Sequence, residues 1–509
     1  MRLLATALLV VTVVASGTAA GADAPTGGLT ADQTARVDAI GNTSVAGRAA
    51  PGVTIGIVWH GAVVYAKGFG YRNVEERVAS DAATRYPIGS NTKQFTAAAI
   101  LMLRDAGKLR LDAKLSTYLP EIPHSNRETI RNLLMHTGGY AEYTANVNFD
   151  ELGARPATPA QVVGLVDAAP LDFVPGTKRS YSNTGYMLLQ MVIERLSGMR
   201  YAEFIRTKIF QAAGMTSSWV RTYDDTRPDT ATEYDTIALG PWEHALHIDY
   251  TWFGGPGSIL SNVEDLAKWN AALAGGKLIS ASSYREMTTP HRIDANFPDY
   301  GFGIMSTKLP NGHRMIFHGG NTTGAATQDA RFPDDDLQII VLSNSGAFSY
   351  DSAVQAIYAT LVPQTAPKAK PHKAAKAAAP TVAGSTPART KAAIAWLESA
   401  IAGKVDLSKL RPDVRARMGP GHLAGYRALA RLGARKYTLA MVDRRAPSTG
   451  YEFLLTTPKA SMVYVYAIED SGLISGVGVY EEPVYQTQAA VKPSPLASAM
   501  PQAAPTPVP

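Results

Sequence analysis

The first clear pattern of apolar and polar positions lies between Gly52 and Gly70. The segment GVTIGIVWHGAVVYAKGFG alternates apolar and small residues on both sides of His60-Gly61. Such alternation is typical of strands, and a short polar break between two alternating runs is typical of a tight turn. The pattern predicts a β-hairpin.

The middle of the chain has a different period. Apolar residues there recur at three- and four-residue steps, which predicts helices with one buried face. In the last of these segments Glu264 follows Ser261 by three residues, an arrangement typical of a capping box, so we expect a helix to begin at Ser261. The predicted helices cover residues 91–106 (ended by Gly107), 128–136, 184–198 (ended by Gly198) and 261–273.

The strand pattern returns in DARFPDDDLQIIVLSN, residues 329–344, as two apolar runs around an Asp-rich turn. Strands at both ends of a unit, with helices between them, predict an α+β fold. We expect a mixed, mainly antiparallel sheet whose first and last strands are neighbours and which helices flank.

Composition changes sharply after Val362. Residues 363–388 are Pro, Ala and Lys with almost no large apolar side chain, which predicts a linker because such a segment cannot bury a core. Residues 389–482 contain two amphipathic helical patterns and four strand patterns, which predict a small α+β domain similar in topology to cystatin- or NTF2-like domains. Residues 483–509, rich in Pro, Ala and Gln, are expected to be a disordered tail.

The length and composition of the chain fit this division into two units. A chain of 509 residues exceeds what one hydrophobic core usually serves, and 46% hydrophobic content is ordinary for globular proteins.

Arg2, the apolar run that follows it and a small-residue cleavage site predict a signal peptide at residues 1–24, so we expect an exported periplasmic or secreted protein with no stable membrane span after cleavage. The chain has no cysteine, which excludes cysteine catalysis. The formal charge of +6 owes much to the linker lysines, so it does not indicate nucleic-acid binding.

Candidate chemistry begins in YPIGSNTKQFTAAAI, where Ser90 and Lys93 lie three residues apart at the predicted start of a helix. Residues at this spacing share a helix face, so the lysine amine can reach the serine oxygen. A serine hydroxyl needs a neighbour to take its proton, and a lysine can do so when burial lowers its pKa. By itself the pair more often reflects an ordinary helix start with a solvated lysine.

Two further segments change that balance. GTKRSYSNTGY contains Tyr181 and Asn183 just before a predicted helix, and IFHGGNTTG contains His318 at the end of an apolar strand. The order Ser-x-x-Lys, Tyr-x-Asn, His-x-Gly resembles the serine hydrolases of the β-lactamase and penicillin-binding-protein superfamily, in particular its class C-related branch of D-alanyl-D-alanine carboxypeptidases, D-aminopeptidases and esterases. LLMHTGGY, GPGSILSNVEDLAKW and YGFGI also resemble landmarks of that branch. The resemblance covers the unit at residues 28–362 and implies an inserted helical subdomain with the active site between it and the sheet.

The resemblance also implies roles for individual residues. Ser90 would be the acylated nucleophile, and Lys93 and Tyr181 would share the proton transfers, with a lysine cation keeping the tyrosine oxygen partly or wholly anionic. Asn183 would hydrogen-bond the substrate amide. The backbone N–H groups of Ser90 and Asn321 would form the oxyanion hole. Gly320 would let the substrate backbone lie close to its strand.

His318 departs from the pattern of β-lactamases, which carry a lysine at this position. A histidine is mostly neutral at pH 7, so it can hydrogen-bond Tyr181 or a substrate oxygen but offers no fixed cation for a β-lactam carboxylate. We therefore expect an acyl-transferring hydrolase acting on D-amino-acid-containing peptides or amides, with cell-wall peptide as one candidate substrate. A carboxylesterase, a weak β-lactamase and a catalytically inactive penicillin-binding sensor are the alternatives.

Other signals are weaker. His136 belongs to the LLMHTGGY loop and is interpreted as structural. No G-x-S-x-G elbow precedes a helix, and no His or Asp/Glu pair has convincing metal spacing, so we expect neither an ordinary α/β-hydrolase triad nor a metal or other cofactor. The oligomeric state cannot be read from the sequence.

Overall fold

The structure of the protein is a computed structural model. It describes residues 28–46, 49–145, 152–167, 169–222, 227–236, 240–291, 299–362, 386–418, 420–445, 448–459 and 461–481. The predicted signal peptide at residues 1–24, the linker up to residue 385 and the tail at residues 483–509 lie outside the described residues.

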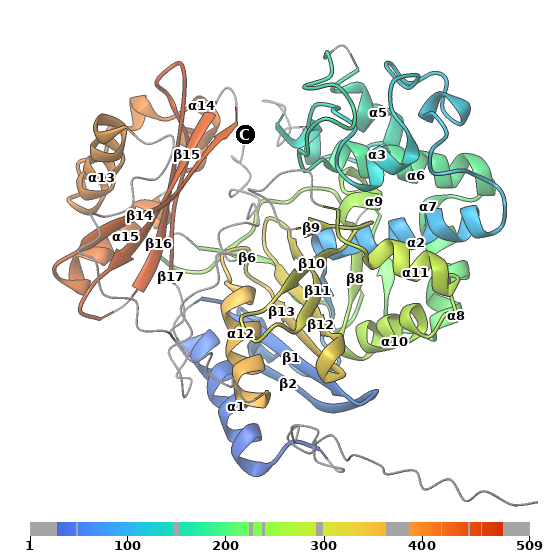
Figure 1. Ribbon diagram of the computed structural model, residues 1–509. Helices are drawn as coiled ribbons and strands as arrows, with labels where there is room; N and C mark the ends of the chain where they lie inside the picture. Colours follow the sequence, from blue (N-terminus) through green and yellow to red (C-terminus); the bar gives the residue numbers. More distant parts are fainter. Residues whose placement is uncertain are drawn as a thin grey trace, which may run out of the picture.

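An eight-stranded sheet forms the centre of the first unit (Figure 1). Every ladder in it is antiparallel, and β1 pairs with β13, so the first and last long strands are neighbours as predicted. In spatial order its strands are β3 (Val78–Ala79), β2 (Ala62–Asn73), β1 (Gly52–Trp59), β13 (Leu337–Ser343), β12 (Ala326–Phe332), β11 (Arg314–Asn321), β10 (Met305–Lys308) and β9 (Asp299–Tyr300).

Helices cover both faces of this sheet (Figure 1). Because successive strand residues point to opposite faces, β13 divides its side chains between two cores. Ile339 and Val341 pack with helices α1 (Ala31–Ala46) and α12 (Tyr350–Leu361). Ile340 and Leu342 belong to the larger core on the other face, which the helical subdomain shares. The expected α+β fold with a helical subdomain is confirmed.

The helical subdomain lies between β4 (Tyr86–Pro87) and the late strands of the sheet. Its longest helices, α2 (Thr92–Asp105), α6 (Asn183–Ser197) and α10 (Val263–Ala274), pack together through a continuous buried core. The shorter helices are α3 (Ile130–Leu134), α5 (Pro159–Gly164), α7 (Tyr201–Phe204), α8 (Gln211–Ala213), α9 (Gly254–Gly257) and α11 (Ala281–Thr288), and the short strands are β5 (Trp219–Val220), β6 (Tyr234–Asp235), β7 (Glu243–His244) and β8 (Ile259–Ser261).

Helix ends follow the sequence with one correction. Gly198 ends α6 in the left-handed conformation, as predicted. The predicted capping box at Ser261 is wrong, because Ser261 is the last residue of β8 and Asn262 caps α10 by accepting a hydrogen bond from the N–H of Asp265. Asparagine caps a helix as well as serine does, and the strand pairing of Ser261 with Tyr86 decides between the two.

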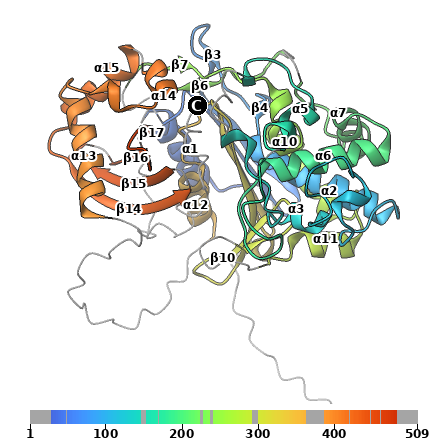
Figure 2. The ribbon, with the colours of Figure 1, turned by 90° about the horizontal axis from the view of Figure 1, so that it is seen from above.

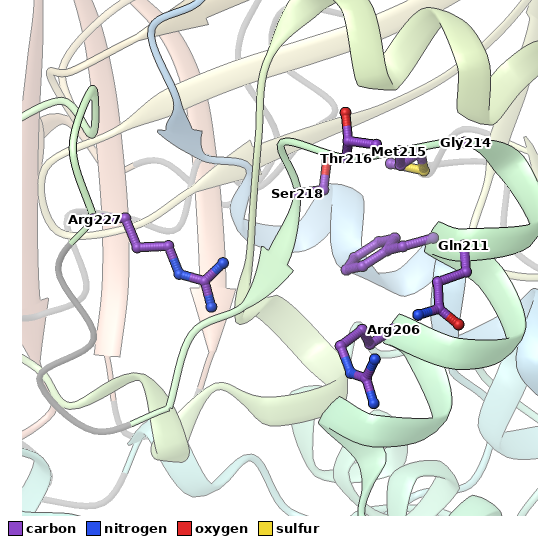
Figure 3. Close-up of a pocket in the computed structure, with 8 residues that line it drawn as sticks. Arg206, Gln211, Gly214, Met215, Thr216, Ser218 and Arg227 are labelled. Carbon is purple, nitrogen blue, oxygen red and sulfur yellow. The ribbon is translucent and has the colours of Figure 1, made fainter.

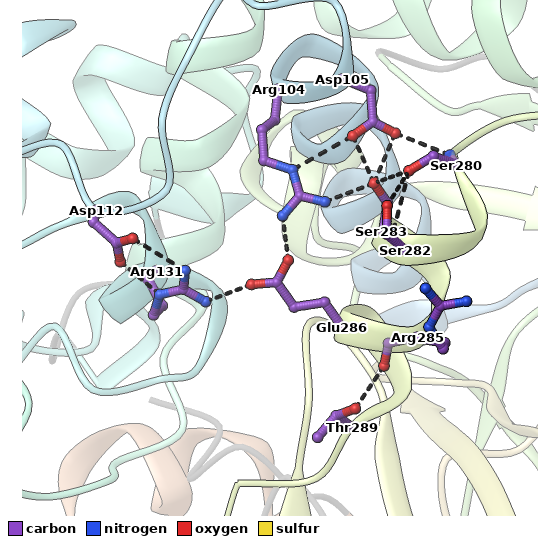
Figure 4. Close-up of polar contacts among 10 residues, drawn as sticks. All are labelled: Arg104, Asp105, Asp112, Arg131, Ser280, Ser282, Ser283, Arg285, Glu286 and Thr289. Carbon is purple, nitrogen blue, oxygen red and sulfur yellow. Dashed lines mark hydrogen bonds and ion pairs between the residues drawn. The ribbon is translucent and has the colours of Figure 1, made fainter.

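Charged side chains fasten the C-terminal end of α2 to α11 (Figure 4). The Arg104 guanidinium bonds Ser283 Oγ at 2.6 Å and also meets Glu286. Arg131, on α3, donates to the same Glu286 carboxylate at 2.7 Å. One carboxylate thus joins three helices at the end of α2 that lies away from Ser90.

The second unit has a sheet and a core of its own (Figure 2). Its first helix begins at Pro387, two residues before the predicted boundary, because the Thr386 side chain caps it. The four strands form an antiparallel sheet in chain order, as the sequence predicts. The elements are α13 (Pro387–Ile401), α14 (Pro412–Arg417), α15 (Pro420–Ala428), β14 (Lys436–Arg445), β15 (Ser448–Thr456), β16 (Ser461–Glu469) and β17 (Ile474–Glu481).

This second unit touches the first through α15. The imidazole of His422 lies 3.6 Å from the carboxylate of Glu243 on β7. At Gly421 an added Cβ would come within 2.1 Å of the same carboxylate, so the backbone of α15 approaches β7 closely. Figure 2 shows β6 and β7 next to α14 and α15. Among the described residues, no helix is long and apolar enough to cross a membrane.

Candidate active site

Ser90 and Lys93 meet at the start of α2. A 3₁₀ turn, Gly89–Asn91, leads directly into the helix, so both residues lie in its first turns. Lys93 Nζ lies 3.1 Å from Ser90 Oγ. The serine is partly exposed, whereas Lys93 has no exposed surface. The predicted contact is therefore present, with the hydroxyl facing outward and the amine behind it.

The amine of Lys93 is held by two more acceptors. It donates to Asn183 Oδ1 at 2.8 Å and to the carbonyl of Pro256 in α9 at 3.0 Å. Burial lowers the pKa of Lys93 to about 7. The carboxylate of Glu142 acts in the opposite direction and raises this pKa by a smaller amount. A substantial fraction of the amine is therefore neutral at physiological pH and can accept a proton.

Tyr181 completes the group around the serine oxygen. Its hydroxyl hydrogen-bonds Ser90, and its ring lies 4.6 Å from Lys93 Nζ. Burial raises the pKa of Tyr181, and the carboxylate of Glu142 raises it further. The expectation of an anionic tyrosine is therefore wrong for this resting site, since the lysine that should stabilise the phenolate is itself partly neutral.

His318 lies on β11 and is fully buried. Its Nδ1 lies 2.5 Å from the Gly319 carbonyl, which can only accept, so Nδ1 carries the proton. Its Nε2 then accepts from the hydroxyl of Tyr300, 3.1 Å away. Burial lowers the pKa of His318 to about 3, so the ring is neutral as expected. Its partner is Tyr300 and not Tyr181, whose ring centroid lies 6.3 Å from that of His318.

The turn before α2 and the end of β11 lie against each other. A Cβ on Gly320 would fall 1.9 Å from the Ile88 carbonyl, and one on Gly89 would fall 2.8 Å from the Asn321 nitrogen. Gly320 is therefore required by contact with the protein's own backbone, whereas the sequence interpretation gave it a role next to substrate. Because the turn before α2 and the end of β11 are in contact, the backbone of Ser90 lies close to the backbone of Asn321.

Several residues outside the predicted catalytic set support this site, among them His136, which the sequence indicated as structural. His136 Nδ1 accepts the N–H of Ser182 at 3.1 Å, and the ring lies 4.4 Å from that of Tyr181, so the LLMHTGGY loop orients the tyrosine. Glu142 accepts the N–H of Asn183 at 2.6 Å. The only signal for Glu142 in the sequence was an acidic residue soon after the His-Thr-Gly-Gly turn. Tyr300 begins the YGFGI landmark, but the sequence assigned it no role.

A separate pocket of about 420 Å³ lies between η4 (Ile205–Phe210) with its following turn and Arg227 (Figure 3). None of the candidate catalytic residues lines it. Its lining is Arg206, Phe210, Gln211, Gly214, Met215, Thr216, Ser218 and Arg227. The chemistry described above is therefore located at the start of α2 and not in this pocket. Among the described residues, no three potential metal ligands gather at one place.

A Ser-x-x-Lys helix start, a tyrosine on the serine oxygen and a strand beside both, on this α+β fold, define a member of the class C-related serine hydrolase superfamily. The Beta-lactamase family profile matches residues 37–362, so the chain belongs to that family.

Individual relatives agree with this assignment. The chain is 32% identical over 302 residues to Penicillin-binding protein 4* of Bacillus subtilis, covering 56% of this chain and 66% of that protein. It is 26% identical over 319 residues to a D-aminopeptidase of Gluconobacter oxydans, covering 61% of this chain and 59% of that protein. The structure of a D-stereospecific amidohydrolase from Streptomyces sp. aligns with a TM-score of 0.57 and 26% identity, covering 64% of this chain and 98% of the other. The chain thus spans about two thirds or less of the curated relatives' length.

Proposed function

We propose that this protein is an exported serine hydrolase that forms an acyl-enzyme on Ser90 with D-amino-acid-containing peptides or amides. The observation that carries the proposal is the buried amine of Lys93, held 3.1 Å from Ser90 Oγ with a pKa of about 7. The names of the D-aminopeptidase and the D-stereospecific amidohydrolase support the substrate class.

In the acylation step, Lys93 Nζ takes the proton of Ser90 as Oγ attacks the substrate carbonyl carbon. The carbonyl π electrons move to oxygen, and the backbone N–H groups of Ser90 and Asn321 would bind that oxyanion. The tetrahedral intermediate collapses by breaking the C–N bond. Tyr181 gives its proton to the leaving nitrogen and recovers one from the Lys93 ammonium, which leaves an ester on Ser90.

Deacylation repeats these transfers with water in place of serine. A water proton passes to the tyrosine–lysine pair as the water oxygen attacks the ester carbon. The same pair returns a proton to Ser90 Oγ as the acid leaves. A neutral lysine is therefore required at the start of each half-reaction.

A neutral His318 also bears on substrate choice. It supplies no fixed positive charge on β11 for the carboxylate of a β-lactam. We therefore place β-lactam turnover below amide and ester turnover for this protein.

A substrate panel with an active-site probe tests the proposal. The panel contains a D-aminoacyl amide and its L-enantiomer, a D-Ala-D-Ala peptide, a p-nitrophenyl ester and a chromogenic cephalosporin. We expect one of the D-configured substrates to be turned over fastest, and intact-mass spectrometry with a fluorophosphonate to find one adduct, absent from Ser90→Ala. Fastest turnover of the cephalosporin would contradict the role given to His318. A protein without an adduct would instead be the inactive binding or sensing protein.

A further inference from the structure

Glu142 lies beside the catalytic group yet has no part in the proton transfers described above. It is partly buried and lies three residues after Gly139, directly before the 3₁₀ turn Tyr143–Ala145. Its Oε2 accepts the N–H of Asn183 at 2.6 Å, and its Oε1 accepts the Thr144 hydroxyl at 2.9 Å. Both carboxylate oxygens are therefore held in place.

The hydrogen bond from Asn183 places this carboxylate at the N-terminus of α6. Asn183 is the first residue of the helix, and Ser182 caps it by accepting the N–H of Gly185 at 3.0 Å. Helix N-termini carry unpaired N–H groups and favour negative charge, so the site suits a carboxylate. Two more hydrogen bonds join this segment to the helix: Thr184 Oγ1 donates to the Ala141 carbonyl and accepts the N–H of Tyr143.

Asn183 connects this carboxylate to the base. While its N–H is bound to Glu142, its side-chain Oδ1 accepts from Lys93 Nζ at 2.8 Å. The orientation of Lys93 toward Ser90 therefore depends on where the first turn of α6 sits.

Charge provides a second connection. The groups that face Lys93 are Glu142, the rings of Tyr181 and Tyr186, and the neutral imidazoles of His136 and His318. Glu142 faces Lys93, Tyr181 and Tyr143. Among these groups Glu142 is the one whose ionised form attracts the ammonium of Lys93, and this attraction opposes the effect of burial on the amine.

We propose that Glu142 is a positioning residue: through Asn183 it aims Lys93 at Ser90, and its negative charge determines the pH range in which Lys93 can take the serine proton. The inference rests on the proposed function, because it concerns the base of that reaction. It assigns Glu142 no contact with substrate.

Two substitutions separate the two effects. Glu142→Gln removes the charge but keeps an oxygen that can accept the Asn183 N–H and an amide N–H₂ that can donate to the Thr144 hydroxyl. Glu142→Ala removes both hydrogen bonds as well. A matched control is Glu194→Gln. Glu194 also accepts a backbone N–H, that of Tyr201 at 2.8 Å, but it lies toward the other end of α6, roughly 16 Å from Asn183 along the helix.

The measurement is the rate at which a fluorophosphonate labels Ser90 between pH 5 and 9, roughly the range over which the base titrates. Without the nearby negative charge the ammonium loses its proton more easily, so in Glu142→Gln the acid limb should move to lower pH by about one unit, with a plateau within about threefold of wild type. In Glu142→Ala the plateau itself should fall by about 10- to 100-fold, because the lysine is no longer aimed. Glu194→Gln should reproduce the wild-type profile.

Thermal unfolding of each variant shows whether it is folded. An acid limb in folded Glu142→Gln that coincides with the wild-type limb overturns the role of the charge. Equal plateaus in the Ala and Gln variants overturn the role in aiming Lys93. If the wild-type protein is not labelled at all, the proposed function is wrong. If the wild type is labelled and the Glu142 variants have the same pH profile of labelling, the proposed function stands and only this inference is wrong.

Discussion

Lys93 combines a buried amine with three hydrogen-bond acceptors, all of them neutral oxygens. Such an arrangement favours a proton acceptor over a permanent cation, because desolvation penalises the ammonium. We expect Lys93→Met to lower kcat/KM by about 10²- to 10⁴-fold, the usual contribution of a general base. Steady-state kinetics on the best panel substrate measure it, with the partly exposed Lys268→Met as control. A smaller loss than tenfold would show that another group takes the serine proton.

The same lysine predicts a pH-dependent stability. Its folded pKa of about 7 lies below the value of about 10.4 expected in the unfolded chain, so between these values the unfolded state binds more protons. The free energy of unfolding contributed by Lys93 therefore rises with pH across this window. We expect wild type to gain stability relative to Lys93→Met as pH increases from 7 toward 10, measured by urea unfolding. A constant difference over this range would contradict the lowered pKa.

Residue types and spacing were enough to predict part of this site. Ser90, Lys93, Tyr181 and Asn183 carry recognisable motifs, and the structure brings all four together. Spacing along one helix cannot report contacts from distant segments, so Glu142 and the contact of Tyr300 with His318 were missed. The protonation of Tyr181 was also missed, because it depends on burial, which only the folded chain determines.

At the scale of elements, the turn before α2 and the end of β11 approach closely at Gly320. We expect Gly320→Ala to reduce the free energy of unfolding by about 1–3 kcal/mol, because the new methyl group meets the Ile88 carbonyl and the Thr327 hydroxyl. Displacing β11 should also lower acylation by about 100-fold or more, the cost of losing one oxyanion donor. Chemical denaturation and fluorophosphonate labelling measure the two effects.

Gly476→Ala in β17 is the matched control for that substitution, since the nearest atom to its added Cβ is 3.5 Å away. It should change neither quantity. A Gly320→Ala protein with wild-type labelling would show that β11 does not need its close contact with the turn.

The order of elements was more predictable than their ends. Alternating patterns at both ends of the first unit correctly predicted that β1 and β13 pair. Local rules decide a boundary less well where tertiary contacts compete. Ser261 fits a capping box by sequence, yet it pairs with Tyr86 in a sheet that no local pattern reveals, and the cap falls on Asn262.

For the whole molecule, the two units have separate cores and meet where α15 approaches β7. Every candidate catalytic residue lies in the first unit. We therefore expect a chain ending at Val362 to fold and to label Ser90 at the wild-type rate. Loss of labelling in a truncated chain that still unfolds cooperatively would show instead that the second unit supports the site through the β6–β7 hairpin.

The pairing of β1 with β13 has a consequence for biosynthesis. β13, which pairs with β1, is almost the last part of the first unit to leave the ribosome, long after Ser90 has emerged. A chain that ends before β13 therefore contains Ser90 but lacks the strand that pairs with β1 and completes the sheet. We therefore expect Ser90 to become reactive only after β13 has paired with β1.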